Sequence, residues 1–523
     1  MYQFSSRLKS FSFALMVLGI LGIGYGFWTA PKTNEDVEAI LKEQEAHHGG
    51  HGEANHDTHA VASHSDATHK EHATHEEHAI VEEHASHDVV SHDAMSHSAE
   101  SVDTLKQEVA HLAVDSTSIA SVPVVSVSKS EVYVSKFHNN EVNHAAEHKA
   151  HVEHVKHQLV NKPWSALYVA CIFFMLIAVG ALAFYAIQWV AQAGWSPMLF
   201  RVMEGVSSYL LPGSIIFIIV LGLISFHVGH NHMFTWMTEG VADPKSPNYD
   251  HIIAGKTGFL NVPFFLIRAV IFLFGWNLYR YVSRKNSIKL DETRDMSFFR
   301  KNYNAAAIFL VFFIVSESMM SWDWIMSVDP HWYSTLFGWY VFASFFVSGI
   351  TVITLTTIYL KNKGLLPEVT KSHLHDLAKF MFGISVFWTY LWFSQFMLMW
   401  YSNIPEEVTY FVFRIENYNL PFFGMVVMNF VFPLLILMNA DFKRLQWVIV
   451  MAGIVILAGH YIDFFNMIMP ATVGDQWFIG VSEISSVLFF AGLFIFVVFT
   501  ALTKAPLASE GNPYIEESKH FHY

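Results

Sequence analysis

Ten apolar segments dominate this sequence of 523 residues and limit what it can fold into. Each is about as long as the roughly 20 mostly apolar residues that cross the hydrocarbon core of a bilayer. Inside that core the backbone N–H and C=O groups must be paired within the segment, so each segment is expected to be a helix. The segments span approximately residues 11–30, 164–190, 207–228, 259–281, 305–325, 337–360, 379–402, 420–438, 446–469 and 481–502. The sequence therefore predicts an all-α integral membrane protein with ten transmembrane helices.

The charge of the chain is concentrated between the first two spans. The whole chain has 45 Asp and Glu against 31 Lys and Arg, a formal charge of -14. Residues 31–163 alone hold 23 acidic and 9 basic residues, which gives the same -14, and the remaining 22 of each sign cancel. This insert is rich in Ala, Ser and Glu and nearly free of aromatic residues, a composition typical of disordered chains. We therefore expect a neutral membrane body with a mostly disordered polar insert.

The Lys and Arg residues of the short loops predict the orientation of the spans. If the N-terminus lies inside, the inner segments contain 18 of them, whereas the short outer loops contain only Lys245, Lys256 and Arg414. Both termini are therefore expected in the cytoplasm and the insert on the outer side of the membrane. The first segment has a poor cleavage site, which favours an uncleaved anchor. The expected parts are an N-terminal anchor at 1–30, the insert at 31–163, a transmembrane body at 164–505 and a cytoplasmic tail at 506–523.

The body contains a weak internal repeat. Asn261-Val-Pro-Phe-Phe opens the fourth span and Asn419-Leu-Pro-Phe-Phe opens the eighth, and Asp323 and Asp463 each precede a proline by seven residues. Spans 2–5 and 6–9 are then predicted to form two four-helix bundles, with spans 1 and 10 as flanking helices. Four spans per unit is an even number, so the two copies would have the same orientation. The alternative is a chance match between Phe-rich helices bounded by proline.

Eight ionisable residues lie within the predicted spans or at their rim. A charged side chain at the centre of a bilayer costs roughly 2.5–3.5 kcal/mol on insertion scales, so each is a candidate functional residue. The candidates are Arg268, Glu317, Asp323, His460 and Asp463, with Glu204, His227 and Glu483 nearer the rim. All but Glu204 are expected at the midplane or in the outer half. Glu204 is either the start of a route from the inner side or part of a solvated helix start.

Two interpretations of these groups are open. In the first, Arg268 pairs with Glu317 or Asp323 only to neutralise buried charge. In the second, a polar cluster conducts protons or contacts a quinol and opens to the outer face. A carboxylate can accept a proton from a hydroquinone and a neutral imidazole can hydrogen-bond its oxygen, provided that burial moves their pKa values towards neutrality. His460 and Asp463 are three residues apart and share one face of a helix.

The stretch from Ser321 to Phe337 is the most distinctive in the chain. Its Trp and Tyr residues are typical of the aromatic belt at a membrane interface. A belt does not explain why Asp323, Asp329 and His331 occur together there. We therefore add His331 to the candidates for a quinol contact or a proton pathway.

Cofactor ligands are scarce in this sequence. The single cysteine, Cys171, excludes an internal disulfide, a Cys-ligated iron–sulfur cluster and a CxxCH haem within this chain. A b-type haem would need His227 and His460 as an axial pair, and both lie near the outer end of their spans, so no haem is expected. The net acidic balance without a basic run argues against nucleic-acid binding.

The insert carries 21 of the 31 histidines. Imidazole suits zinc, copper and nickel, and the weak metal candidates are His69, His72, His75 and His78. A three-residue step turns successive side chains by roughly 60° on a helix, so no compact four-ligand face would form. Full protonation of 21 imidazoles, with pKa values of about 6.5, would change the charge of the insert from -14 to +7. We expect the insert to act as a pH-sensitive tether that is not part of the site.

Three long motifs in the body resemble a known family. They are Asp329-Pro-His-Trp-Tyr-Ser-Thr-Leu-Phe-Gly-Trp-Tyr, Trp392-Phe-Ser-Gln-Phe-Met-Leu-Met-Trp-Tyr-Ser-Asn-Ile-Pro-Glu-Glu, and His460-Tyr-Ile-Asp-Phe followed by Met469-Pro-Ala-Thr-Val-Gly. They look like the NrfD/polysulfide-reductase-type membrane subunits of bacterial alternative complex III, and most closely like the ActF type. The likeness covers roughly residues 160–505, and the first span loosely, but not the insert.

The resemblance implies a subunit of a bacterial quinol:cytochrome c oxidoreductase that is not catalytic alone. The chain itself would bind no cofactor other than quinol or quinone, and partner subunits would carry the iron–sulfur clusters and c-type haems. One partner would be a paralogous membrane subunit, which is generally credited with the quinol site. Two alternatives remain open, namely a purely structural scaffold of the same complex and a metal or ion transporter whose His-rich loop gathers cations.

Overall fold

The computed structural model of the protein describes residues 2–31, 33–48 and 129–522, with side chains at 2–31, 33–43 and 147–522. The chain divides into two compact units, Met1–Gln44 with Ala146–Tyr523, and Glu45–Ala145. The ten spans belong to the first unit. The described residues form helices and turns, without a β-strand among them.

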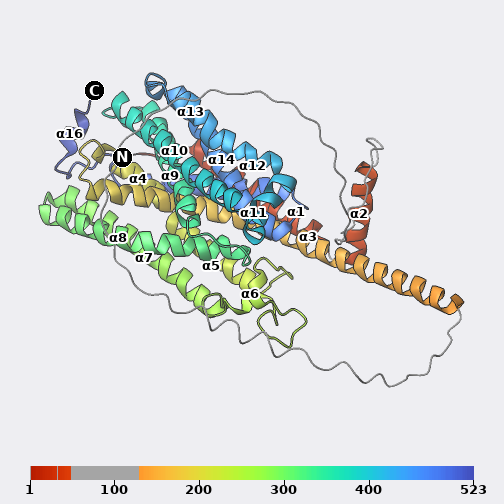
Figure 1. Ribbon diagram of the computed structural model, residues 1–523. Coiled ribbons are helices and arrows are strands. Elements are labelled where there is room, and N and C mark those ends of the chain that lie inside the picture. Colours follow the sequence, from red (N-terminus) through yellow and green to blue (C-terminus); the bar gives the residue numbers. More distant parts are fainter. Residues whose placement is uncertain (1, 32, 49–128, 523) are drawn as a thin grey trace, which may run out of the picture. The chain divides into compact units, whose positions relative to one another are not determined.

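Within the described residues, ten helices are long and apolar enough to cross a membrane, as predicted (Figure 1). They are α1 (Ser6–Thr29), α3 (Lys129–Val190), α4 with α5 (Phe200–Ser207 and Leu210–Ser225), α7 (Val262–Thr293), α8 (Met296–Trp324), α9 (Phe337–Asn362), α10 (Lys371–Ser402), α12 with α13 (Asn419–Val426 and Phe432–Leu437), α14 (Gln446–Val473) and α15 (Val481–Leu502). The all-α membrane fold is thus confirmed. The arrangement as two repeated four-helix bundles stays a prediction.

Both chain termini lie at one end of the bundle (Figure 1), as an even number of crossings requires. This end, the terminal face, carries the loop between α3 and α4 and the short helix α16 (Ile515–Lys519). The opposite end, the distal face, carries α6 (His251–Ala254) and α11 (Pro405–Asn417). Helix α11 was not predicted because it is only 13 residues long and begins with Pro-Glu-Glu. Proline at the first helical position and acidic residues in the first turn are favourable starts for a helix.

Helices α7 and α8 extend beyond the predicted spans at the terminal face. Helix α7 has 32 residues, which is about 48 Å at 1.5 Å per residue, against about 30 Å for the hydrocarbon core. It ends at Arg294, which has a left-handed φ of 58°. The next residue, Asp295, caps α8 by accepting a hydrogen bond from the backbone N–H of Ser297. The predicted spans ended where charged residues lower the hydropathy, whereas the hydrogen-bonded backbone of α7 and α8 continues through those charged residues.

The end of the insert is helical and continuous with the second span. Pro163, the expected boundary between insert and body, lies inside α3. A small apolar cluster joins this part of α3 to α2 (Asn34–His48), with Val37 packed against Val152 and Val155. The Lys156 ammonium also donates a hydrogen bond to the side-chain oxygen of Asn34 at 3.0 Å. Both ends of the insert therefore have helical structure next to the membrane body.

Helix α1 packs against α15 through small residues. A Cβ atom added to Gly19 would overlap the backbone of Phe489, and one added to Gly22 would overlap the side chain of Ser485. Small residues let two transmembrane helices approach closely, and the gain is van der Waals contact. By contrast, a Cβ atom on Gly24 would meet nothing within 4 Å.

We expect Gly19→Leu to separate α1 from α15. Overpacking of this kind costs about 1–3 kcal/mol, so the thermal unfolding temperature of the detergent-purified protein should fall. Gly24→Leu is the matched control on the same helix and should leave the unfolding temperature unchanged. Equal unfolding temperatures for the two variants would contradict the close α1–α15 contact.

Candidate functional site

Six buried polar side chains meet near the middle of the bundle. This Asp463 cluster consists of Tyr340, Ser344, Trp388, Asn429, His460 and Asp463, each with an exposed fraction of 4% or less. Tyr340 and Ser344 are four residues apart on α9, and His460 and Asp463 are three apart on α14, so each pair shares a helix face. Trp388 comes from α10. Of the candidates from the sequence, the structure brings His460 and Asp463 together here.

The carboxyl group of Asp463 is held by neutral donors. The hydroxyl of Tyr340 donates to Oδ1, and the hydroxyl of Ser344 and the indole N–H of Trp388 each lie 2.8 Å from Oδ2. Within the described part of the chain, no Lys or Arg forms an ion pair with this carboxyl. Burying a carboxylate is costly unless it is hydrogen-bonded and paired. Asp463 is thus well hydrogen-bonded but has no permanent counter-charge.

The imidazole of His460 is linked to Asp463 through one hydroxyl. Its Nδ1 lies 2.9 Å from Oγ of Ser344 and 3.5 Å from Oδ2 of Asp463. A serine hydroxyl has one proton and two lone pairs. If Ser344 donates to Asp463, its oxygen can accept a hydrogen bond from an Nδ1–H of His460; if it donates to His460, Nδ1 must be unprotonated and accept. The position of this single proton therefore depends on the tautomer of His460, whose Nε2 is buried and has no hydrogen-bond partner among the described residues.

A π-helical turn positions Asn429, the member of the cluster that comes from the segment between α12 and α13. The turn η4 (Val427–Val431) joins α12 to α13, and its last hydrogen bond runs from the N–H of Phe432 to the carbonyl of Val427, five residues earlier. Pro433 has no N–H to offer to the carbonyl four residues earlier, which explains the local widening. Asn429 then lies 3.4 Å from Nδ1 of His460. A Cβ atom on Gly459 would overlap the Asn429 side chain, so glycine is required at this approach.

Two cavities extend from the cluster towards the distal face. The first has a volume of about 10 Å³ and is lined by Tyr340, Tyr410 and Arg414 among others, which is about the space that one water molecule needs. The second has a volume of about 340 Å³ and is lined by Tyr410, Arg414, Asp329 and His331. Tyr410 and Arg414 line both, so the two cavities are neighbours. The small cavity borders the Asp463 cluster at Tyr340, and the large one borders the predicted candidate His331.

Arg414 has a structural reason to be buried between these cavities. Pro470 interrupts the hydrogen bonds of α14 because it has no N–H for the carbonyl of Asn466. The Nε of Arg414 donates to that carbonyl at 2.9 Å. The guanidinium also lies over the ring of Tyr410, 3.3 Å from its centre. The sequence placed Arg414 among the outer-loop cations and gave no sign of this role.

His331 lies at the distal face and contacts a different carboxylate. Its Nε2 is 2.6 Å from Oδ2 of Asp250, in the loop that leads into α6. This hydrogen bond lowers the pKa of Asp250 below its ordinary value, with help from the backbone N–H groups that Asp250 caps. Nearly half of the His331 side chain is exposed. His331 therefore belongs to the surface end of the cavities and not to the buried cluster.

Arg268 and Asp323 form a separate, closed ion pair. Arg268 Nε donates to Asp323 Oδ2 at 2.6 Å and Nη2 donates to Oδ1 at 2.7 Å. The guanidinium also donates to the carbonyl of Phe259 and lies between the rings of Phe259 and Phe264. Glu317 is not part of this pair. The predicted neutralising partner of Arg268 is thus Asp323, and both groups are fully engaged.

Glu317 and Glu483 are buried carboxyl groups with few partners. Oε2 of Glu317 accepts a hydrogen bond from Ser318 at 3.2 Å, and its Oε1 has no partner among the described residues. Glu483 lies in the first turn of α15, where its Oε2 accepts a hydrogen bond from the N–H of Gly480 at 2.8 Å. That contact makes Glu483 a helix cap. Neither residue contacts the Asp463 cluster.

His227 lies just beyond the end of α5. It has a left-handed backbone with φ of 51°. Its ring nitrogens lie 2.9 Å from the carbonyl of Asn231 and 3.3 Å from that of Met237. His227 therefore holds the distal loop together, and the structure does not bring it near His460.

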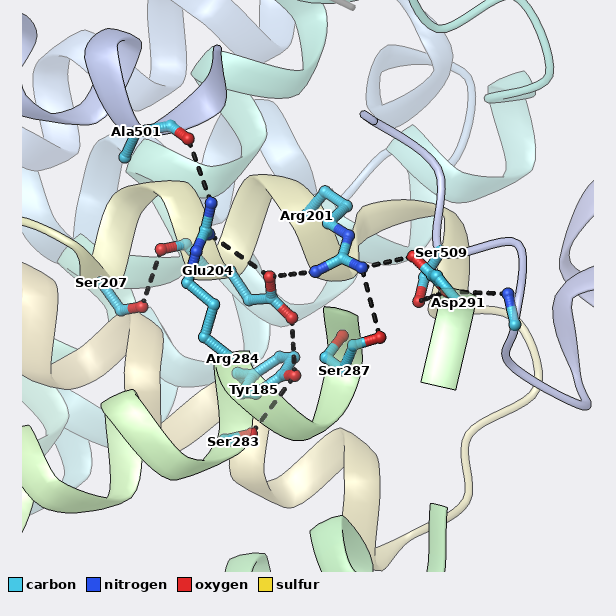
Figure 2. Close-up of polar contacts among 11 residues, drawn as sticks. Tyr185, Arg201, Glu204, Ser207, Ser283, Arg284, Ser287, Asp291, Ala501 and Ser509 are labelled. Atoms are coloured by element: carbon cyan, nitrogen blue, oxygen red, sulfur yellow. Dashed lines mark hydrogen bonds and ion pairs between the residues drawn. The ribbon is translucent and has the colours of Figure 1, made fainter. Parts of the chain in front are cut away.

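Glu204 is the centre of an ion-pair network at the terminal face (Figure 2). Its Oε2 lies 2.6 Å from Nη1 of Arg201 and 3.4 Å from Nη1 of Arg284, and its Oε1 accepts a hydrogen bond from Tyr185 at 2.9 Å. Glu204 is 3% exposed. The expectation of a solvated helix start at this position is therefore wrong, because the side chain packs between two arginines.

The C-terminal tail closes this network. Arg201 also pairs with Asp291, whose Oδ1 accepts a hydrogen bond from the N–H of Gly511 at 2.7 Å and another from Ser509 at 3.3 Å (Figure 2). A Cβ atom on Gly511 would overlap the backbone of Leu290. The tail thus docks on α7 through a residue that must be glycine.

Metal ligands do not gather in the described part of the chain, which contains no group of three or more His, Cys, Asp or Glu residues that could hold an ion. The weak metal candidates His69, His72, His75 and His78 lie outside the described residues. The cluster members that the sequence did not single out are neutral, namely Tyr340, Ser344, Trp388 and Asn429. Neutral polar side chains carry no strong penalty in a span, so they gave no signal.

Comparison with known proteins adds no identification. No protein-family model matches the chain, and no curated protein aligns with it significantly.

Breaking the Arg268–Asp323 pair should be strongly destabilising. Arg268→Leu leaves the buried Asp323 carboxylate uncompensated, which costs about 3–5 kcal/mol, and thermal unfolding in detergent should show it. Replacing both residues by Leu should recover much of this loss because no unpaired charge remains. A double variant as unstable as the single variant would argue against a closed, purely neutralising pair.

Gly511→Ala should release the tail from α7. The added methyl group cannot fit against Leu290, so the hydrogen bond from Gly511 to Asp291 is lost and trypsin should cut at Lys504 several-fold faster. Gly383→Ala serves as control because a Cβ atom there meets nothing within 4 Å. Unchanged cleavage of the Gly511 variant would show that the tail is held by other contacts.

Proposed function

We propose that this chain is a membrane subunit of a bacterial respiratory quinol:electron-acceptor (cytochrome c) oxidoreductase. In this proposal the Asp463 cluster transfers protons or contacts the quinol in the outer half of the membrane. The observation that carries it is the environment of Asp463, a fully buried carboxyl group with neutral donors and an imidazole 3.5 Å away. A carboxyl group without a permanent counter-charge can gain and lose a proton at a smaller cost than one locked to an arginine.

The contrast with Asp323 supports this choice of residue. Asp323 is held by two charge-assisted hydrogen bonds from Arg268, so its proton acceptors are tied to a permanent cation. Asp463 and His460 are instead linked by the Ser344 hydroxyl, which can donate to one or the other. A proton can pass between the two groups by rotation of this hydroxyl and a change of tautomer.

A route to the distal face also supports the proposal. Tyr340 bonds to Asp463 and lines the small cavity, whose other walls include Tyr410 and Arg414. The larger cavity then reaches the imidazole of His331, nearly half of which is exposed. In this scheme protons released at Asp463 leave at the face that carries His331. The excess of Lys and Arg at the other face favours the periplasm as the destination.

The proposed setting is a multi-subunit complex in the bacterial inner membrane. The chain would bind no metal or haem of its own, and partner subunits, including a paralogous membrane subunit, would carry the iron–sulfur clusters and c-type haems. Both termini would lie in the cytoplasm and the His-rich insert in the periplasm. The motifs around Asp329, Trp392 and His460 support this setting through their resemblance to subunits of alternative complex III.

A structural scaffold of the same complex is the second candidate. It is favoured by the closed Arg268–Asp323 pair and by the Glu204 network, which stabilise the bundle without an open binding space. The transporter hypothesis has no comparable support, since the described residues bring no metal-ligand set together.

Asp463→Asn tests the function in the intact complex. The amide keeps the shape of the side chain but cannot carry the proton, so quinol turnover and the coupled proton release should fall by about a hundredfold, the lower end of what a positioned acid or base contributes. Asp243→Asn is the control because this aspartate is exposed in a distal loop. Blue-native electrophoresis with haem staining checks that each variant still assembles.

The outcomes separate the candidates. Unchanged turnover and coupling in an assembled Asp463 variant would favour the scaffold. A wild-type chain that migrates alone, without haem-containing or iron–sulfur partners, would overturn both the proposal and the scaffold.

A further inference from the structure

A groove on the membrane-facing surface separates α9 from α14 near the terminal face. It has a volume of about 680 Å³ and is lined mainly by apolar side chains, among them Ile358, Val450 and Ile454. Ligand pockets of about 300–1,000 Å³ are typical. The groove forms where the helices diverge, because nearer the midplane Gly453 packs directly against Leu355 and Thr351 of α9.

The groove has a polar end and an apolar end. Asn362, Gln446 and Trp447 line its polar end, and tryptophan is typical of the membrane–water interface. Ile454 lies seven residues further along α14, which is roughly 10 Å deeper into the bilayer at 1.5 Å per residue. The side chain of Ile454 is 59% exposed and that of Trp447 is 66% exposed. The groove therefore begins at headgroup level and runs into the hydrocarbon core.

Three cations lie close in the sequence to residues of the polar end, and one of them, Lys443, is buried with its ammonium over the Phe382 ring of α10. Lys363 follows Asn362 directly, and Lys443 and Arg444 come just before Gln446. None of the three forms an ion pair with a carboxylate in the described part of the chain. The acidic residues nearby are Asp441, in the same loop, and Asp376, which pairs with Lys379 at 2.5 Å. The polar end therefore keeps an excess of positive charge.

We infer that this groove is a binding site for one anionic phospholipid. The phosphate group would lie among Lys363, Arg444 and the polar side chains of Asn362 and Gln446, and an acyl chain would occupy the apolar part towards Ile454. An apolar channel with a cationic, polar mouth at headgroup depth matches a lipid with a negative headgroup. A helix of another subunit would not need the unpaired cations at one end.

Native mass spectrometry of the full-length protein in detergent tests the inference. Phosphatidylglycerol and phosphatidylcholine with identical palmitoyl and oleoyl chains are the probes. We expect phosphatidylglycerol to bind more tightly, and Lys363→Gln with Arg444→Gln to weaken its binding by about tenfold, since each cation near an anionic lipid contributes substantially. Equal binding of the two lipids to the wild-type protein would overturn the inference.

Two controls separate the groove from general surface charge. Lys285→Gln with Lys289→Gln removes the same charge from α7, which does not line the groove, and should leave phosphatidylglycerol binding unchanged. Ile454→Trp fills the apolar part and should remove the bound lipid without altering the cations. If the α7 double variant weakens binding as much as the groove double variant, the inference fails.

A photo-crosslinking side chain in place of Trp447, a large aromatic residue that already lines the groove, identifies the occupant in membranes. Benzoylphenylalanine placed there should give an adduct with the mass of a phospholipid. A crosslink to a polypeptide would instead assign the groove to a protein partner and overturn the inference.

Discussion

A backbone carbonyl that loses its N–H partner inside a bilayer finds no water to replace it, and this constraint explains how the second half of the bundle is built. Pro433 and Pro470 each remove one donor from a transmembrane helix. At Pro433 the helix widens into a π turn, which directs Asn429 towards His460. At Pro470 the guanidinium of Arg414 supplies the missing donor to the carbonyl of Asn466. The compensation of both prolines thus places polar groups beside the Asp463 cluster.

The two buried aspartates illustrate two solutions to the same electrostatic problem. Asp323 is neutralised by the guanidinium of Arg268, which also donates to the carbonyl of Phe259. Asp463 relies instead on hydroxyl and indole donors. These neutral dipoles satisfy the carboxyl oxygens without an ion pair to a Lys or Arg of the described residues.

The sequence predicted the number and type of the spans because hydrophobic length is a strong constraint, and it predicted that His460 and Asp463 share a helix face. One of its two open interpretations paired Arg268 with Glu317 or Asp323, and the choice between these carboxylates needed the packing of α7 on α8. The neutral members of the cluster could not be predicted, since a serine or tyrosine in a span has no distinctive hydropathy. Arg414 was missed for another reason. It lies on α11, a helix of 13 residues that is too short to be predicted as a transmembrane span. Its partner, the carbonyl freed by Pro470, belongs to another helix, and their contact can be known only from the packed structure.

The contact between α1 and α15 has a consequence for the order of assembly. The ribosome delivers α1 well before α15, so the glycine-lined face of α1 lacks this neighbour until α15 has been made. Until then α1 must remain near the growing bundle without that packing, and pairings between distant segments form late. A product that ends before α15 would therefore leave the glycine-lined face of α1 unpaired in the bilayer.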